Sequence, residues 1–250
     1  MQPSDIKKKP IQKREKKQWL PKKENLRTRA YNILKQEIVT LRLSPGSYID
    51  KEALQRRLSV GSTPLREALL RLEAEKLVVN IANTGFYVKD LNLPSIRELL
   101  ENRMFLERYA AFLAIQRIDE EEIERLHQIA VEMRTLAEKN DEYELVMKDM
   151  QFHSTLVKAA KNHQLETIMS MIYNESLRVW FISHYEEINE SVQMHFKIIE
   201  MLKQNNWDLL EREIIHHNNV FRERLEGYFK NFLKENTRGK SEFRVDIPRG

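Results

Sequence analysis

The chain of 250 residues contains no cysteine. This absence excludes a disulfide framework, a thiolate zinc site and a cysteine nucleophile, and it fits a reducing cytoplasm. Glycine and proline are scarce, with six and seven residues, so the composition favours helix over sheet. No apolar run of about 18 residues occurs, so we expect no membrane span, and no secretory signal is evident at the N-terminus. We therefore expect a cytoplasmic, mainly α-helical protein.

The net charge of +4 is unevenly distributed. Residues 1–24 hold nine basic and three acidic side chains. Such a segment cannot bury enough apolar surface to fold, so we expect a disordered basic tail. It would either attract phosphates without sequence preference or only aid solubility, and the residues alone do not decide between these roles. The polar residues 236–250 predict a second disordered tail.

Residues 25–90 have the pattern of a winged helix-turn-helix. A first helical pattern ends at the breaker 43–46, and Asp50 is suited to cap a short second helix. A third helix is expected to begin at Thr63, with Pro64 in its first position. Its buried stripe comprises Leu65, Ala68, Leu69 and Leu72. Two short strands, 77–81 and 85–88, are expected to form a hairpin, the wing.

After a short linker, residues 95–233 are helical in pattern. Helices are expected at 94–117, 119–139, 141–161, 164–184, 188–204 and 207–233. The predicted fold class is therefore mainly α, with an N-terminal winged helix-turn-helix and a C-terminal all-α six-helix bundle.

The third helix is the candidate DNA-reading element. Placing its apolar stripe inward turns Thr63 and Arg66 outward, where residues of such a helix meet base edges. Arg66 can donate two hydrogen bonds to guanine or bind a phosphate, and the Ser62 and Thr63 hydroxyls lie where backbone amides suit a phosphate. Gly85, at the hairpin tip, would allow close approach to the minor groove. The alternative is an ordinary helical hairpin with a surface arginine, but order, spacing and turn chemistry together favour DNA binding.

At these residues the chain resembles the GntR family of DNA-binding regulators. The resemblance rests on residues 58–68, with supporting matches at 43–46, 72–78 and 85–88. One departure is notable: the family usually has Ser and Arg where this chain has Gly61 and Ser62. Because that arginine often contacts DNA, the operator sequence cannot be inferred. The resemblance implies a homodimer that binds double-stranded DNA at a short palindromic operator.

Asp149 and His153 are four residues apart and share one helix face, as in a chelating pair. His195 and His217 flank the expected turn at Asn205-Asn206 at nearly equal distances. In an antiparallel hairpin both would lie about 15 Å from the turn, level with each other. His216 is the rival of His217, but it points about 100° away on the same helix. We choose His217.

One carboxylate and three imidazoles suit a divalent transition metal. Zinc is the first choice, with nickel, manganese or iron as alternatives to it, because calcium and magnesium prefer oxygen ligands. Arg103 lies among apolar residues of the first long helix, where it could bind a carboxylate through two hydrogen bonds. The alternative for Arg103 is a salt bridge with Glu107, four residues further on.

This half of the chain resembles the FCD effector domain of the FadR subfamily. The resemblance is carried by Arg103 with 106–107, by 149–153 and 159–162, and by the last two histidines. It implies metal ligands at Asp149, His153, His195 and His217, and a carboxylate-binding role for Arg103. Met194 departs from the glutamate that often precedes the family's histidine. The chain resembles the six-helix VanR type more than FadR itself.

Three functions are compatible with these residues. The favoured one is a DNA-binding transcriptional regulator, a repressor and not an enzyme, whose operator binding responds to a small carboxylate at a metal site. A metal-dependent hydrolase fused to a DNA-binding head is the second, although no general base, nucleophile elbow or phosphate loop is evident. The third is a helical domain that only dimerises and binds no metal.

Overall fold

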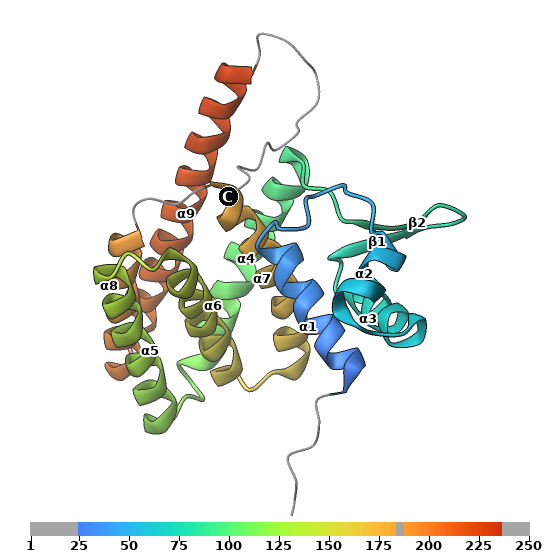
Figure 1. Cartoon of the computed structure of the whole chain (residues 1–250). Helices are drawn as coiled ribbons and strands as arrows, with labels where there is room; N and C mark the ends of the chain where they lie inside the picture. Colours follow the sequence, from blue (N-terminus) through green and yellow to red (C-terminus); the bar gives the residue numbers. More distant parts are fainter. Residues whose placement is uncertain (1–24, 184–187, 237–250) are drawn as a thin grey trace, which may run out of the picture.

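The computed structural model describes residues 25–183 and 188–236 (Figure 1). Within them the chain is mostly helical, with one small two-stranded sheet, which confirms the predicted fold class. The tails predicted at 1–24 and 236–250 lie outside the described residues, apart from Asn236 at the end of the last helix. No described helix is both long and apolar enough to cross a membrane.

The N-terminal head consists of α1 (Leu26–Val39), α2 (Lys51–Leu58), α3 (Ser62–Ala74), β1 (Val78–Ile81) and β2 (Gly85–Val88). The Asp50 carboxylate accepts the amide hydrogen bond of Ala53 and so caps α2, as predicted. The two strands pair antiparallel, with Val78 opposite Val88. The apolar stripe of α3 is fully buried against α1, so the opposite face of α3 is left to solvent.

The start of α3 differs from the prediction. The helix begins at Ser62, with Gly61 in the N-cap position and no side-chain cap, so Thr63 is not the cap. The turn between α2 and α3 therefore comprises only residues 59–61, and Ser59 at its start adopts a left-handed conformation with φ 52°. Pro64 is still tolerated, since amides in the first turn of a helix have no partner within the helix.

Gly85 is required by the packing of the wing itself. Its φ is +122°, and a Cβ there would lie 3.1 Å from a ring carbon of Tyr48. Tyr48 in turn forms a bridge with Tyr87 of β2. Internal packing therefore accounts for this glycine, whereas the sequence had suggested close approach to DNA.

The C-terminal domain comprises α4 (Leu93–Ala114), α5 (Glu120–Glu138), α6 (Glu142–Ala159), α7 (His163–Ser183), α8 (Ile188–Lys203) and α9 (Trp207–Asn236). These bounds lie within three residues of those predicted. Helices α8 and α9 form the expected hairpin around Asn205 and Asn206. Near that turn Leu210 is buried and Leu209 is exposed.

The head packs against the helical domain through α7, which lies beside α1 (Figure 1). The Asn174 amide donates to Glu75, the residue that ends α3, over 3.3 Å. Lys89, just after the wing, forms a salt bridge of 2.6 Å with Glu175. Arg178 donates to the carbonyl of Lys89. One segment of α7 therefore holds both the end of the DNA-reading helix and the linker.

We expect Gly85→Ala to destabilise the protein by about 1–3 kcal/mol, because alanine is strained at positive φ and its methyl group would press on Tyr48. Gly227→Ala is the matched control, since this glycine lies within α9 with open space around its Cα. There alanine should stabilise by about 0.5–1 kcal/mol. Urea unfolding of both variants measures the two changes, and equal effects would contradict the explanation.

Candidate metal centre and nucleic-acid interface

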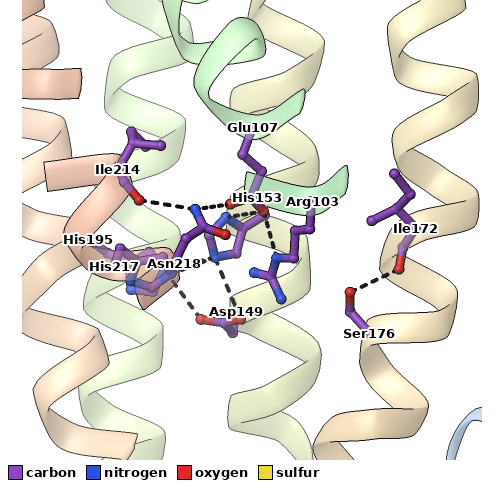
Figure 2. Close-up of polar contacts among 10 residues, drawn as sticks. All are labelled: Arg103, Glu107, Asp149, His153, Ile172, Ser176, His195, Ile214, His217 and Asn218. Carbon is purple, nitrogen blue, oxygen red and sulfur yellow. Dashed lines mark hydrogen bonds and ion pairs between the residues drawn. The ribbon is translucent and has the colours of Figure 1, made fainter. Parts of the chain in front are cut away.

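Four predicted ligands meet at one point inside the helical domain (Figure 2). Asp149 and His153 come from α6, His195 from α8 and His217 from α9. All four side chains are buried, and one ligand atom from each lies within 4.8 Å of all the others. Helix α6 and the α8–α9 hairpin thus direct their polar groups to a common centre.

The distances within this Asp149–His217 cluster match those between ligands of one ion. His195 Nε2 lies 3.3 Å from Asp149 Oδ1, and His217 Nε2 lies 3.0 Å from His153 Nε2. The third nitrogen pair, His195 and His153 Nε2, is separated by 3.4 Å. Ligands at about 2.0–2.1 Å in a tetrahedral zinc site would lie about 3.3 Å apart. The four side chains are therefore close enough together to hold one ion.

Burial keeps the histidines in the form that binds metals. It lowers the pKa of His195 to about 4, and it lowers the pKa values of His153 and His217 well below their ordinary value. Burial also raises the pKa of Asp149 to about 7, although Arg103 opposes that rise. The imidazoles are therefore neutral near pH 7, and a bound cation would stabilise the Asp149 carboxylate. The donor set fits a divalent transition metal.

Glu107 of α4 is a neighbour of this cluster whose place in the site was not predicted. Its Oε1 lies 3.3 Å from His153 Nδ1 and 3.0 Å from Arg103 Nε. Asn218 donates to its other oxygen over 2.7 Å. A proton on His153 Nδ1 would face this carboxylate and would leave the lone pair of Nε2 directed into the cluster. The spacing of four from Arg103 was the only local signal for Glu107.

Arg103 is 2% exposed and forms the salt bridge with Glu107 that was the alternative reading of the sequence. This contact uses Nε. Its Nη1 atom is buried and has no hydrogen-bond partner in the part of the chain that the structure describes. The guanidinium lies 4.7 Å from the centre of the Phe221 ring. Arg103 thus has donor capacity left over after its internal salt bridge.

A small cavity of about 10 Å³ separates Arg103 from the ligand cluster. It is lined by Arg103, Asp149, Trp180, Ser191, His217, Val220 and Phe221. This volume holds about one water molecule. A larger group could enter only if neighbouring side chains moved, and the bulkiest of these are Trp180 and Phe221.

The remaining described histidines lie elsewhere. His216 and His163 are exposed, and the half-buried His127 packs on Phe196. His184 lies outside the described residues. The structure therefore places His217, and not His216, beside the other ligands.

The candidate DNA contacts are grouped at the start of α3. Ser62, Thr63 and Arg66 are all exposed, as a reading surface requires, while Leu65 between them is buried. Gly85 lies separately, at the start of β2 in the wing. The structure thus brings three of the four predicted DNA contacts together on one helix.

Comparison with known proteins identifies both halves. Residues 26–88 match the gntR family of bacterial regulatory proteins, and residues 98–219 match the FCD domain. The chain is 31% identical over 180 residues to the Nta operon transcriptional regulator of Aminobacter aminovorans, covering 72% of this chain and 84% of that protein. The chain belongs to the GntR family. The resemblance seen in the sequence is confirmed.

Two further proteins support the assignment to the GntR family. The gluconate operon transcriptional repressor of Bacillus subtilis is 26% identical over 200 residues, covering 77% of this chain and 81% of the repressor. The solved structure of E. coli McbR/YncC has the same fold, with a TM-score of 0.73 at 18% identity, over 82% of this chain and 99% of that one. The protein is a transcriptional regulator with a DNA-binding GntR domain, and not an enzyme.

We expect Arg66→Ala to weaken binding to a preferred DNA sequence by about 1–3 kcal/mol, because a paired contact to guanine is lost. A suitable probe is the sequence that the wild-type protein selects from a random duplex library. Arg125→Ala, an exposed arginine of α5, removes the same charge far from the head. Fluorescence anisotropy compares the variants, and equal losses would exclude Arg66 from the reading surface.

Proposed function

We propose that this GntR regulator is a repressor whose operator binding is modulated by a small carboxylate bound beside a metal ion in the FCD domain. One observation carries the proposal. A buried carboxylate and three imidazoles converge at one point, and Arg103, whose Nη1 has no hydrogen-bond partner among the described residues, lines the cavity beside them. A cationic centre and a cationic donor on one small cavity form a pair of contacts suited to an organic anion.

The metal would be held by Asp149, His153, His195 and His217. This nitrogen and oxygen donor set favours zinc, with nickel, manganese or iron as the other candidates. A bound ion supplies a Lewis-acid contact for the effector's carboxylate wherever its coordination shell remains open. Glu107 orients His153 for this purpose, as residues outside a ligand shell commonly do.

The cavity is so small that a carboxylate could bind in it only if neighbouring side chains moved. Because its volume is only about 10 Å³, a carboxylate would displace side chains such as Trp180 of α7 and Phe221 of α9. These two rings stack on each other with 5.5 Å between their centres. Binding would therefore alter the packing between α7 and α9.

Helix α7 is the route by which this change would reach the head. The Tyr173 ring lies 5.7 Å from the Arg103 guanidinium, and the next residue, Asn174, donates to Glu75 at the end of α3. The effector can act as a switch only if it binds two arrangements of α7 unequally. A shift of α7 in response to the effector would reposition the DNA-reading helix.

On the operator, α3 would present Ser62, Thr63 and Arg66 to the major groove, and the wing with Gly85 would lie alongside. The basic residues 1–24 would add contacts to phosphates without regard to sequence. A homodimer would place two such heads on a short palindrome.

His217→Ala tests the metal. We expect the untagged wild-type protein to carry stoichiometric zinc, and the variant to lose most of it because a ligand is missing. His216→Ala, the adjacent exposed histidine, should retain the wild-type content. Mass spectrometry of the elements after dialysis measures this content. Wild-type protein that stays sub-stoichiometric after reconstitution would favour the metal-free, dimerising alternative.

Arg103 variants test the effector. In calorimetric titrations of the metal-loaded protein with a panel of small carboxylates, we expect Arg103→Ala to lose at least tenfold in affinity. Arg103→Lys should restore it only in part, since lysine keeps the charge but not the planar fork. Metal content and thermal unfolding are measured in parallel, because breaking a buried ion pair costs about 3–5 kcal/mol. Equal affinity in wild type and both folded variants would exclude Arg103 from the effector site.

A further inference from the structure

A groove of about 420 Å³ lies between the N-terminal half of α4 and the C-terminal half of α9. Apolar side chains form most of its lining, among them Leu93, Leu100, Met104, Leu225 and Phe229. Each of the two helices also contributes one arginine and one glutamate to the lining. An apolar surface of this kind, with charges of both signs beside it, is typical of an interaction site.

The two helices are antiparallel, and α9 extends beyond α4 at the outer end of this groove. Phe112, near the end of α4, meets Trp207 at the start of α9, with ring centres 5.1 Å apart. Leu93, the first residue of α4, lines the groove together with Phe229. Helix α9 continues to Asn236, about 10 Å past Phe229, and its end projects from the bundle (Figure 1). The chain therefore leaves α9 close to the outer end of the groove.

Residues 237–250 follow α9, and part of this segment has the sequence pattern of a strand with one apolar face. Phe243, Val245 and Ile247 alternate with two charged residues, and successive side chains of an extended chain point to opposite sides. The three apolar side chains would therefore face the same way. Because the segment as a whole is polar, we expect no fold of its own, and such a segment becomes ordered only on a partner surface.

The dimensions of this segment match those of α9 along the groove. From Phe229 back to Arg222 the helix rises about 10 Å. An extended chain covers about the same length from Phe243 to Asp246. A segment that returned along the groove with Phe243 beside Phe229 would therefore bring Asp246 level with Arg222.

The charges favour the same direction and register. Arg222 forms only a long ion pair with Glu226, with 3.9 Å between Nε and Oε1, and its Nε has no hydrogen-bond partner among the described residues. The two side chains are 42% and 54% exposed, so they can reach a strand at the mouth of the groove. Asp246 would then face Arg222, and Arg244 would lie near Glu226. The reverse direction would bring Arg244 to Arg222 and oppose like charges.

We propose that residues 243–247 of this chain bind in the α4–α9 groove as an extended segment that runs from Phe229 towards Met104. The connecting residues 237–242 are long enough for this. At about 3.3 Å per residue they exceed the distance of about 10 Å from Asn236 back to the level of Phe229, with length to spare for a turn.

The bound segment would hold α4 to α9 between the DNA-binding head and the effector cavity. Leu93, at one end of the groove, directly follows the linker 89–92. Met104, which also lines the groove, is adjacent in sequence to Arg103. This contact involves neither the metal ligands nor the cavity beside them, so it goes beyond the proposed function and does not depend on it.

Paired cysteines test the contact in the full-length chain, which has no cysteine of its own. Met104→Cys with Ile247→Cys should form a disulfide within one chain in a mild oxidant. Glu223→Cys with Ile247→Cys is the matched control, because Glu223 is exposed and lies next to Arg222 but points about 100° away from it around α9. We expect the first pair to react at least tenfold faster on non-reducing gels.

Equal rates for the two pairs would overturn the proposal, because they would show that the segment does not prefer the groove. A mixture of the two single variants, Met104→Cys and Ile247→Cys, tests the alternative that the segment comes from another copy. A disulfide that forms in this mixture as fast as in the double variant would assign the groove to a neighbouring chain and would also overturn the proposal.

Charge reversal tests the register in the same Met104→Cys, Ile247→Cys chain. Arg222→Asp should slow disulfide formation at least fivefold, since it would face Asp246. Adding Asp246→Arg should restore the rate, whereas Asp246→Arg alone should slow it. Circular dichroism of each variant should match that of the parent chain, because Arg222 is only half-buried. Rates that none of these substitutions changed would contradict the pairing and overturn the proposal.

Discussion

The buried salt bridge between Arg103 and Glu107 determines how the polar groups of the helical domain are oriented. Both side chains lie on α4 and are almost inaccessible to solvent. Neither charge would be tolerated there alone, since an unpaired buried ion costs about 3–5 kcal/mol. Glu107 also meets His153 and Asn218. This single carboxylate therefore contacts an arginine, a histidine and an amide together.

The position of Glu107 between Arg103 and His153 explains why the cavity lies next to the Asp149–His217 cluster. Glu107 pairs with Nε of Arg103, while Nη1 has no hydrogen-bond partner among the described residues, and the Arg103 side chain also lines the cavity. The same carboxylate leaves Nε2 of His153 free to face His195 and His217. Most buried polar atoms in a protein have a hydrogen-bond partner. The interior of this domain differs, because it contains polar side chains whose hydrogen-bonding capacity is not fully used. Such unused capacity is the physical basis for proposing a ligand at this point.

Helix α7 connects this interior to the DNA-binding head through neighbouring residues. Tyr173 lies over the site, and Asn174, Glu175 and Arg178 hold the end of α3 and the linker. A displacement of α7 would therefore be transmitted to the head, because protein interiors are closely packed. The head and the helical domain are in this way joined by direct polar contacts of α7.

The sequence by itself determined the local features. Periodicity located the helices, spacing of four paired Asp149 with His153, and equal distances from the Asn205 turn brought His195 level with His217. These are properties of one helix or one hairpin, so they follow from 3.6 residues per turn. Where the sequence erred, as with the Thr63 cap, the helix begins one residue earlier than the pattern indicated.

Only the tertiary structure decided which helices met. The approach of α6 to the α8–α9 hairpin depends on packing across the whole bundle, and from sequence it was implied by resemblance alone. The contacts of Glu107 with His153 and Asn218 span three helices, and no spacing rule reaches that far. Likewise, a side chain at position 85 would meet the ring of Tyr48. Tyr48 lies in a loop that is distant from Gly85 in the sequence. A contact between residues far apart in the sequence depends on how many side chains pack together. No single local sequence pattern therefore predicts it.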